Sequence, residues 1–350
     1  MKKIALMLLV VAFLLSGCNA FASQQVPTTI PLSSLLLNED PDLQPTLTPF
    51  QPIAPTPTKT PIMATATSAP TTQGDIIQLY TQYPTMASQN IATPNGQIRI
   101  LLLGSDYRPG RGSRTDVMML LTLNPSTGTA TLLSFPRDLY VNIPGIGMER
   151  INTAQGYGDF ALTTATFQQN FGFTPDYYVM TNFSGFQGII DTLGGIEVNV
   201  GSPLTDKCKI EGLRQADGYC TIKTGTNYMD GQTALWYVRS RYTSSDFDRT
   251  RRAQEVILGI FQRLMKAGVV NKAPEIYNQF KGSVETNMPL ETIVSLLPLA
   301  NQLINDTSKI RRYAIGAAET YNYIVPTTGA YVLVPDQTAV MSIIFQALSE

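Results

Sequence analysis

The sequence contains no histidine, a single tryptophan and only three cysteines among its 350 residues. The lack of histidine excludes Ser/His/Asp and Cys/His nucleophile systems and the usual zinc sites. Charged residues make up 15% of the chain, and 25 basic against 26 acidic residues leave a net charge of −1. No general electrostatic attraction for nucleic acid is therefore expected. Any acid or base chemistry depends on carboxylates, lysine, tyrosine or a metal-bound species.

The apolar run at the N-terminus is too short to span a bilayer comfortably. Two lysines precede twelve apolar residues, from Ile4 to Leu15, and the run closes with LSGC at Cys18. This pattern is typical of a secretion signal rather than a transmembrane helix. LSGC resembles the lipobox of bacterial lipoproteins, which implies cleavage before Cys18 and lipid on its sulfur. We interpret residues 1–18 as a lipoprotein signal peptide, the alternative being an ordinary signal peptide with an incidental cysteine.

A segment rich in proline and threonine follows, as in PTLTPFQPIAPTPTKTP. Such a composition buries too little apolar surface to offset the entropy of ordering, so residues 19–95 are expected to form a disordered tether. Two acyl chains on Cys18 would anchor the chain stably at the extracytoplasmic face of the cell membrane. The folded domain, expected over residues 96–350, would then stay within reach of that membrane.

Two cysteines remain after Cys18, and they are Cys208 and Cys220. An even pair in an exported chain favours a disulfide. Two free buried thiols are the alternative.

Strands and helices are predicted to alternate through the folded domain. Residues 97–104 form a nearly continuous apolar run of strand length, and residues 117–135 form a hairpin around NPSTG. Helical spacing follows over 153–171, 183–193 and 252–268, and strands over 176–182, 196–200 and 331–334. A helix over 290–303 is expected to begin after Thr286 and Asn287, and a last one after Asp336. This alternation favours a layered α/β domain.

Charged side chains gather in three loops that follow or precede these elements. The loop 104–116, the turn after 135 and the segment 238–254 contain nine of the fifteen arginines. Planar guanidinium groups suit a multiply charged oxyanion, so the implied ligand is phosphate or pyrophosphate. Asp106 and Asp116 in the first loop could bind Mg²⁺ together with substrate phosphates. The loop lacks the GxxxxGK[ST] pattern.

Simpler interpretations exist for single residues. Arg137 and Asp138 could form a structural ion pair that closes a turn. Asp116 could cap or bend the chain before a strand. The arginines around residue 250 could lie on a solvated helix face.

Six segments together resemble the LytR-CpsA-Psr family of cell-wall glycopolymer transferases. They are GSDYRPGRGSRTDVMMLLTLNP, LLSFPRDLYVNIPG, ERINTAQGYG, FSGFQGIIDTLGGIEVNV, MDGQTALWYVRSRY and DFDRTRRAQEVI. The resemblance covers residues 97–265 closely and the C-terminal part more loosely. It implies a three-layer α/β/α domain with a central mixed β-sheet and an apolar tunnel for a polyprenyl tail.

The resemblance also implies roles for single residues. Asp106 and Asp116 would hold Mg²⁺, either of them could take the acceptor proton, and Arg137 would act with them in catalysis. The pyrophosphate would be bound or supported by Arg114, Arg137, Asp138, Arg150, Arg239, Arg241, Arg249, Arg252 and Gln254. Arg150 stands where the family often has lysine, and Ala253 precedes Gln254 where the family often has a glutamine pair. Family members usually carry an N-terminal transmembrane helix, in contrast to the anchor predicted here.

The implied activity is transfer of a glycopolymer, such as teichoic acid or capsule polysaccharide, from a polyprenyl pyrophosphate carrier. The acceptor would be a hydroxyl of peptidoglycan or another envelope polymer. Two other functions stay open: a non-catalytic lipoprotein that binds polyprenyl phosphate or wall polymer, and a lipid pyrophosphatase. No feature of the sequence indicates a nucleic-acid partner.

Overall fold

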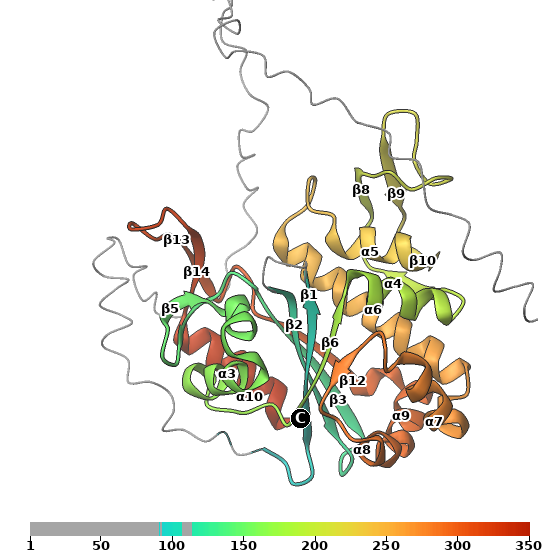
Figure 1. Ribbon diagram of the computed structural model, residues 1–350, viewed down its shortest axis with the longest axis horizontal. Coiled ribbons are helices and arrows are strands. Elements are labelled where there is room, and N and C mark those ends of the chain that lie inside the picture. The colour runs from blue at the N-terminus through green and yellow to red at the C-terminus, as the bar shows by residue number, and fades with distance from the viewer. Residues whose placement is uncertain (1–90, 92, 107–113) are drawn as a thin grey trace, which may run out of the picture. The chain divides into compact units, whose positions relative to one another are not determined.

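A mixed sheet of six strands forms the centre of the folded domain (Figure 1). The computed structural model describes residue 91, residues 93–106 and residues 114–350. The predicted signal peptide with Cys18, nearly all of the tether, and Arg108 and Arg111 lie outside this part of the chain. Among the described residues, no helix combines the length and hydropathy needed to cross a bilayer.

The strand order in the central sheet is β11-β6-β1-β2-β3-β12. β1 pairs in parallel with β6, β3 pairs in parallel with β12, and the other neighbours are antiparallel. The strands are β1 (Ile98–Ser105), β2 (Thr115–Asn124), β3 (Thr129–Phe135), β6 (Tyr177–Asn182), β11 (Glu285–Thr286) and β12 (Ile310–Ala314).

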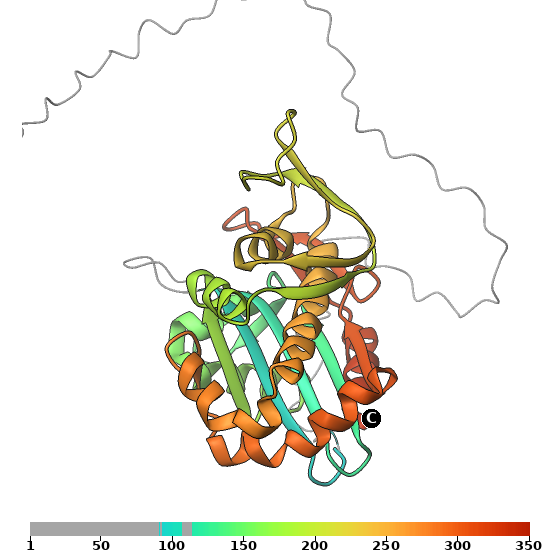
Figure 2. The same ribbon diagram turned by 90° about the vertical axis from the view of Figure 1, so that its right-hand side faces the viewer.

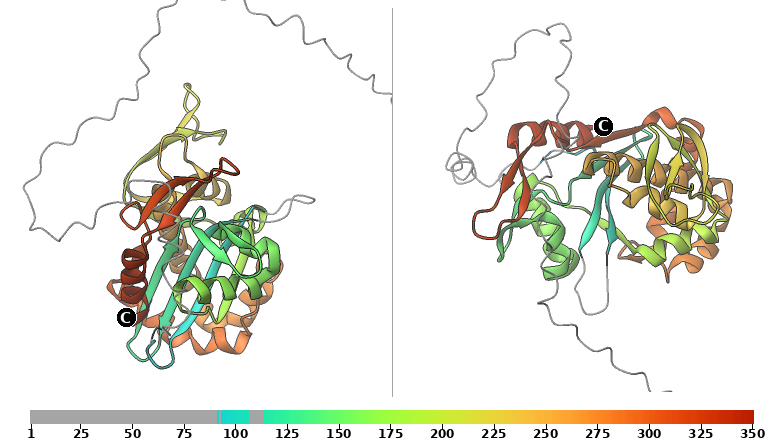
Figure 3. Two further views of the ribbon diagram at one scale, coloured as in Figure 1. Left: turned by 90° about the vertical axis from the view of Figure 1, so that its left-hand side faces the viewer. Right: turned by 90° about the horizontal axis from the view of Figure 1, so that it is seen from above.

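One face of this sheet is covered by α3 (Ala154–Phe171) and α10 (Gln337–Ser349), as the left view of Figure 3 shows. Alternate residues of β1, Leu101 and Leu103, point to this side, as the two-residue period of a strand requires. The space between the layers is filled by four phenylalanines. Phe135 and Phe167 meet edge to face, with ring centroids 5.0 Å apart.

The opposite face is covered by α6 (Asp246–Lys266), which crosses the sheet in Figure 2, and by shorter helices. These are α4 (Phe183–Thr192), α5 (Gly231–Arg239), α7 (Val269–Phe280), α8 (Leu290–Ser295) and α9 (Leu297–Asn305). Leu102 of β1 and Leu121 of β2 belong to the apolar cluster on this side. The predicted three-layer α/β/α fold with a mixed sheet is therefore confirmed.

The remaining strands form small two-stranded sheets around the central sheet. They are β4 (Tyr140–Ile143) with β5 (Gly147–Arg150), β7 (Ile196–Val200) with β10 (Gly225–Met229), β8 (Leu204–Lys207) with β9 (Tyr219–Ile222), and β13 (Thr320–Ile324) with β14 (Tyr331–Pro335). Two short 3-10 turns, η3 (Ile151–Thr153) and η4 (Thr307–Lys309), complete the described elements.

Two helix boundaries differ from the sequence expectations. The helix expected over 252–268 begins earlier, at Asp246, because Ser245 and Asp248 form a reciprocal capping box. The single helix expected over 290–303 is two helices, with Pro298 in the first turn of the second. The predicted caps for it were wrong, since Thr286 lies in β11 and the Asn287 side chain accepts a hydrogen bond from Tyr178 N.

Candidate active site

A cavity of about 410 Å³ lies between the central sheet and helices α4 to α7. Most of its wall is apolar. β1, β2 and β6 supply Leu102, Met119 and Val179, and α6 supplies Val256, Ile257 and Ile260. Five charged residues also line it: Asp116, Arg137, Arg239, Arg241 and Arg249. Four positive charges against one negative charge favour an anion in this cavity.

Asp116 reaches the cavity through an irregularity in β2. Gly104 of β1 pairs with Val117, but the next residue, Ser105, pairs with Thr115. Asp116 is the unpaired extra residue of this β-bulge. Bulges redirect a side chain without ending the strand, and they are frequent at functional sites.

Arg137 follows the end of β3 and contacts three carboxylates. Its Nη1 donates to Asp116 Oδ1 at 2.8 Å, and its Nε lies 3.4 Å from Asp138 and 4.0 Å from Asp246. Burial acts to lower the pKa of Arg137, but the hydrogen bond to Asp116 and the surrounding carboxylates raise it. The Nε is buried and makes no hydrogen bond within the described part of the chain. The Arg137 Nε therefore meets Asp138 and Asp246 as an ion pair without a hydrogen bond.

Arg249 lies in the first turn of α6, where Ser245 fixes the start of the helix. Its Nη2 donates to an oxygen of Asp246 at 3.0 Å and to the backbone oxygen of Asp116 at 3.3 Å. Burial, together with the charges of Arg137 and Arg241, lowers the pKa of this guanidinium. A bound anion would relieve this mutual repulsion.

Arg239 and Arg241 stand at the end of α5 and just beyond it. The Arg239 guanidinium lies over the ring of Phe183, 4.1 Å from the ring centroid, at the start of α4. This stacking holds a flexible cationic side chain beside the cavity. Both arginines are exposed, in contrast to Arg249.

Asp138 and Arg150 extend the network away from the cavity. Arg150 Nε lies 3.3 Å from Asp138 Oδ1, and its Nη2 donates to the backbone oxygen of Tyr331 at 2.7 Å. Neither residue lines the cavity. The structure therefore connects Arg150 to the cavity only through Asp138 and Arg137.

Arg252 and Gln254 lie beneath the site. Arg252 is 1% exposed and donates to Ser244 Oγ at 3.0 Å and to the backbone oxygen of Ser240. Gln254 Nε2 donates to Ser134 Oγ in β3 and to the backbone oxygen of Tyr313 in β12, both at 2.8 Å. Their hydrogen-bond partners are protein atoms, which suits a supporting role better than a contact with ligand.

Asp106 and Arg114 sit where β1 ends and β2 begins. The Asp106 backbone N–H donates to the backbone oxygen of Arg114 at 3.0 Å, and the Arg114 N–H donates to Asp106 Oδ1 at 2.9 Å. The Arg114 side chain is exposed, and neither residue lines the cavity. The link between these two residues continues the pairing of β1 with β2.

Asp106 and Asp116 fit a Mg²⁺ site only if a bound ligand supplies further oxygen atoms. Among the described residues, no group of three or more acidic, cysteine or histidine side chains could hold a metal ion. Asp116 Oδ1 already accepts from Arg137, and Asp106 Oδ1 from a backbone N–H. Mg²⁺ commonly takes one or two carboxylates, waters and substrate phosphates, so this donor set fits a metal that arrives with a phosphorylated ligand.

Sequence reasoning missed two residues of this site, Asp246 and Phe183. The Asp246 carboxylate forms ion pairs with both Arg137 and Arg249, and the Arg239 guanidinium stacks on the ring of Phe183. The spacing of three residues between Asp246 and Arg249 is a recognisable helical pair, once the helix start is placed correctly. The stacking on Phe183 joins separate elements and has no local signal.

A cavity with apolar walls and four arginines is complementary to an amphiphilic anion. The sequence profile of the LytR_cpsA_psr family matches residues 64–346, and the chain belongs to this family. This confirms the resemblance inferred from the sequence.

Similarity to individual proteins agrees with this assignment. The chain is 33% identical over 209 residues to the polyisoprenyl-teichoic acid–peptidoglycan teichoic acid transferase TagT of Bacillus subtilis, a match that covers 58% of this chain and 64% of TagT. The crystal structure of B. subtilis TagV superposes with a TM-score of 0.61 at 25% identity, covering 73% of this chain and 96% of TagV. A structure of TagT with bound octaprenyl pyrophosphate superposes with a TM-score of 0.52 at 26% identity, covering 74% and 92%.

Proposed function

We propose that this protein transfers a glycopolymer from a polyprenyl pyrophosphate carrier to a hydroxyl of peptidoglycan or another envelope polymer. The observation that carries the proposal is the cavity itself, which has four arginines at one end and apolar walls elsewhere. A pyrophosphate head with a prenyl tail is complementary to both parts. The naming of TagT as a teichoic acid transferase, and the octaprenyl pyrophosphate bound in a TagT structure, support the choice.

The transfer exchanges a phosphoanhydride bond of the carrier for a phosphoester bond to the acceptor. The acceptor hydroxyl oxygen bonds to the phosphorus that carries the glycan, while the bond from that phosphorus to the bridging oxygen of the pyrophosphate breaks. Polyprenyl phosphate leaves, and the hydroxyl proton passes to a carboxylate and then to solvent. Such chemistry requires aligned reactants and fixed positive charge more than covalent participation by the protein.

The charged residues divide this work. Arg137 and Arg249, both largely buried, would hold the phosphate oxygens, and the exposed Arg239 and Arg241 would close over them. Asp116 is the carboxylate on the cavity wall, so it is the preferred proton acceptor. Asp116, with Asp106, would also hold Mg²⁺, which would neutralise charge on the phosphate oxygens.

The remaining roles extend the same proposal. Asp138 and Arg150 would orient Arg137 from outside the cavity, and Arg114 would meet the glycan or phosphate at the strand end. Arg252 and Gln254 would support the arginines from below.

We also propose that the chain is exported and lipid-anchored through Cys18. The bonded pair Cys208 and Cys220 supports export, because disulfides persist mainly in oxidising compartments. Replacing Cys18 by serine is expected to abolish labelling with radioactive palmitate and to release the protein from membranes. Continued labelling of Cys18→Ser would contradict the anchor.

The activity is tested by incubating purified protein and Mg²⁺ with a polyprenyl pyrophosphate-linked glycan, with and without peptidoglycan. The proposal expects polymer on the acceptor and release of polyprenyl phosphate only when the acceptor is present. Release without acceptor would indicate a pyrophosphatase instead. Binding without any release would indicate a carrier protein.

A further inference from the structure

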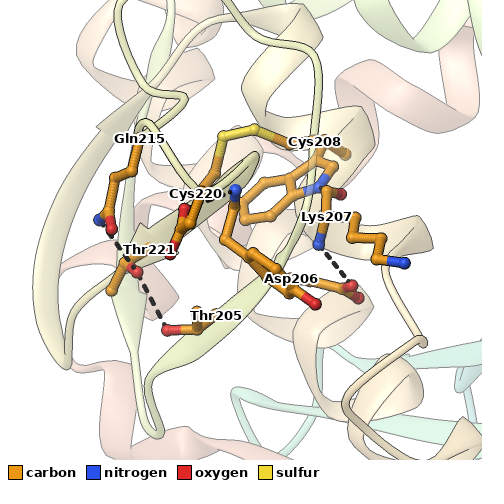
Figure 4. Close-up of a disulfide and its surroundings, with 10 residues drawn as sticks. Thr205, Asp206, Lys207, Cys208, Gln215, Cys220 and Thr221 are labelled. Carbon is orange, nitrogen blue, oxygen red and sulfur yellow. Dashed lines mark hydrogen bonds between the residues drawn. A yellow bond between two sulfur atoms is a disulfide. The ribbon is translucent and has the colours of Figure 1, made fainter.

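The hairpin β8–β9 projects from the domain and is closed by a disulfide (Figures 1 and 4). Cys208 and Cys220 follow β8 and lie within β9, with their Cα atoms 5.7 Å apart. Both are buried, against Ile210 and the partly buried Trp236 of α5. The Trp236 Nε1 donates to the backbone oxygen of Lys207 at 2.9 Å. The disulfide thus joins the end of β8 to β9, and Trp236 holds this pair against α5, the helix that ends at Arg239.

Asp206, in this hairpin, is 2% exposed. One carboxylate oxygen accepts from the Lys207 backbone N–H at 2.7 Å, and the other accepts from the Tyr242 backbone N–H at 3.0 Å. The adjacent Thr205 backbone oxygen accepts from Thr243 Oγ1 at 2.5 Å. The strand therefore holds two consecutive residues of the segment Ser240–Ser244, which we call the arginine loop.

The arginine loop is held from the opposite direction by α6. Arg252 donates to the Ser240 backbone oxygen and to Ser244 Oγ. Four of the five residues in the arginine loop are thus fixed by contacts to β8 or α6. The fifth, Arg241, lines the cavity, and its side chain makes no hydrogen bond or ion pair with the described residues. Its placement depends on the backbone around it.

We infer that Asp206 is a positioning residue, which places the Arg241 guanidinium at the cavity through the Tyr242 backbone, and that the disulfide keeps Asp206 in place. A carboxylate suits this role because it can accept from two N–H groups, whereas an amide presents one oxygen and one donor. An asparagine at this position would face one of the two N–H groups with its own NH₂. The inference rests on the proposed function only for the nature of the anion.

A double-mutant cycle tests the inference, with geranylgeranyl pyrophosphate as the probe and calorimetry as the measurement. Asp206→Asn and Arg241→Ala are each expected to weaken binding roughly 5- to 10-fold. The double variant is expected to bind no more weakly than Arg241→Ala alone. Effects that multiply in the double variant would overturn the inference, because Asp206 would then act independently of Arg241.

Asp217→Asn is the matched control, since it makes the same change in the same hairpin. Asp217 accepts from the Tyr219 N–H at 3.0 Å and makes no hydrogen bond or ion pair with the described arginine loop, so the variant should bind the probe with wild-type affinity. If Asp206→Asn does not fold, Thr243→Val loosens the loop from the solvent side. Thr243→Val is expected to lower the probe affinity roughly two- to three-fold, and this loss should disappear in the Arg241→Ala background. Wild-type affinity in Thr243→Val would overturn the inference.

The two proposals fail differently. Wild-type protein that does not bind the probe, or Arg137→Ala that binds it as tightly, would contradict the proposed function and with it this inference. Wild-type binding that is lost in Arg137→Ala but unchanged in Asp206→Asn would contradict only the positioning role. The Cys208→Ser/Cys220→Ser variant should reproduce the Asp206→Asn effect, and full wild-type affinity would remove the disulfide from the account.

Discussion

The two faces of the central sheet are packed in opposite ways. Between the sheet and α3, the rings of Phe135, Phe167, Phe171 and Phe173 contact one another and leave little space. Between the sheet and α6, a cavity of about 410 Å³ remains, although most of its wall is apolar. Protein interiors are normally close-packed, so an apolar space of this size requires an explanation.

The difference indicates where stability and function are located. The face packed against α3 by phenylalanines stabilises the sheet. The face toward α6, the open side, has a cavity with room for an apolar chain. Arg137 and Arg249 lie at the end of the open side where β2 and α6 begin, next to Asp116.

Replacing Phe167 by alanine should destabilise the protein by about 3–5 kcal/mol, because the ring is fully buried among aromatic neighbours. Urea unfolding measures the loss. Folded Phe167→Ala protein should bind geranylgeranyl pyrophosphate with wild-type affinity. A variant of wild-type stability would contradict the assignment of this face as the stabilising one.

Replacing Arg137 by alanine should slow transfer by roughly 100- to 1000-fold, since it removes a fixed positive charge from the phosphate site. The same change should leave Asp116 without its ion-pair partner. Initial rates with lipid-linked glycan provide the measurement. Arg311→Ala is the control, because Arg311 is 57% exposed, pairs with Glu350 and does not line the cavity. A wild-type rate in Arg137→Ala would exclude a role of the Arg137 charge at the phosphate site.

Replacing Ile257 by tryptophan should fill part of the cavity and weaken binding of a long prenyl pyrophosphate roughly 10- to 100-fold, through lost burial of the chain. Binding of inorganic pyrophosphate should not change. Ile343→Trp makes the same substitution beside the filled face, where overpacking should cost about 1–3 kcal/mol of stability and leave affinity intact. Equal effects of the two variants on affinity would break the contrast.

Replacing Ser245 by alanine should cost about 1 kcal/mol, because Ser245 caps the helix that covers the cavity. The hydrogen bond from the Ser245 hydroxyl lowers the pKa of Asp248, so this contribution is present above the ordinary value of 3.8 and is lost as the pH falls below it. Urea unfolding should therefore show a larger difference between the two proteins at about pH 7 than well below pH 3.8, where only the bond from the Asp248 backbone N–H to Ser245 Oγ remains. An unchanged difference at low pH would contradict the linkage.

The sequence predicted the layers because strand and helix periods are local properties. The hairpin β2–β3, the helix α3 and the strand β6 all followed from apolar spacing. The arginines that line the cavity were expected together because Arg137, Arg239, Arg241 and Arg249 all flank predicted elements.

Other features depend on packing between distant segments. The bulge that turns Asp116 into the cavity, the stacking of Arg239 on Phe183 and the cavity itself have no local sequence signal. The sequence could have predicted in part that Arg249 lines the cavity whereas Arg252 does not. Ser245 and Asp248 form a capping-box pattern, and a helix starting there places Arg249 three residues after Asp246.

A crystal structure of this protein with octaprenyl pyrophosphate tests the central claim most directly. The account predicts that the prenyl chain lies in the cavity between β1 and α6 and that pyrophosphate oxygens lie within hydrogen-bonding distance of Arg137 and Arg249. A lipid bound on another surface, with the cavity unchanged, would contradict it.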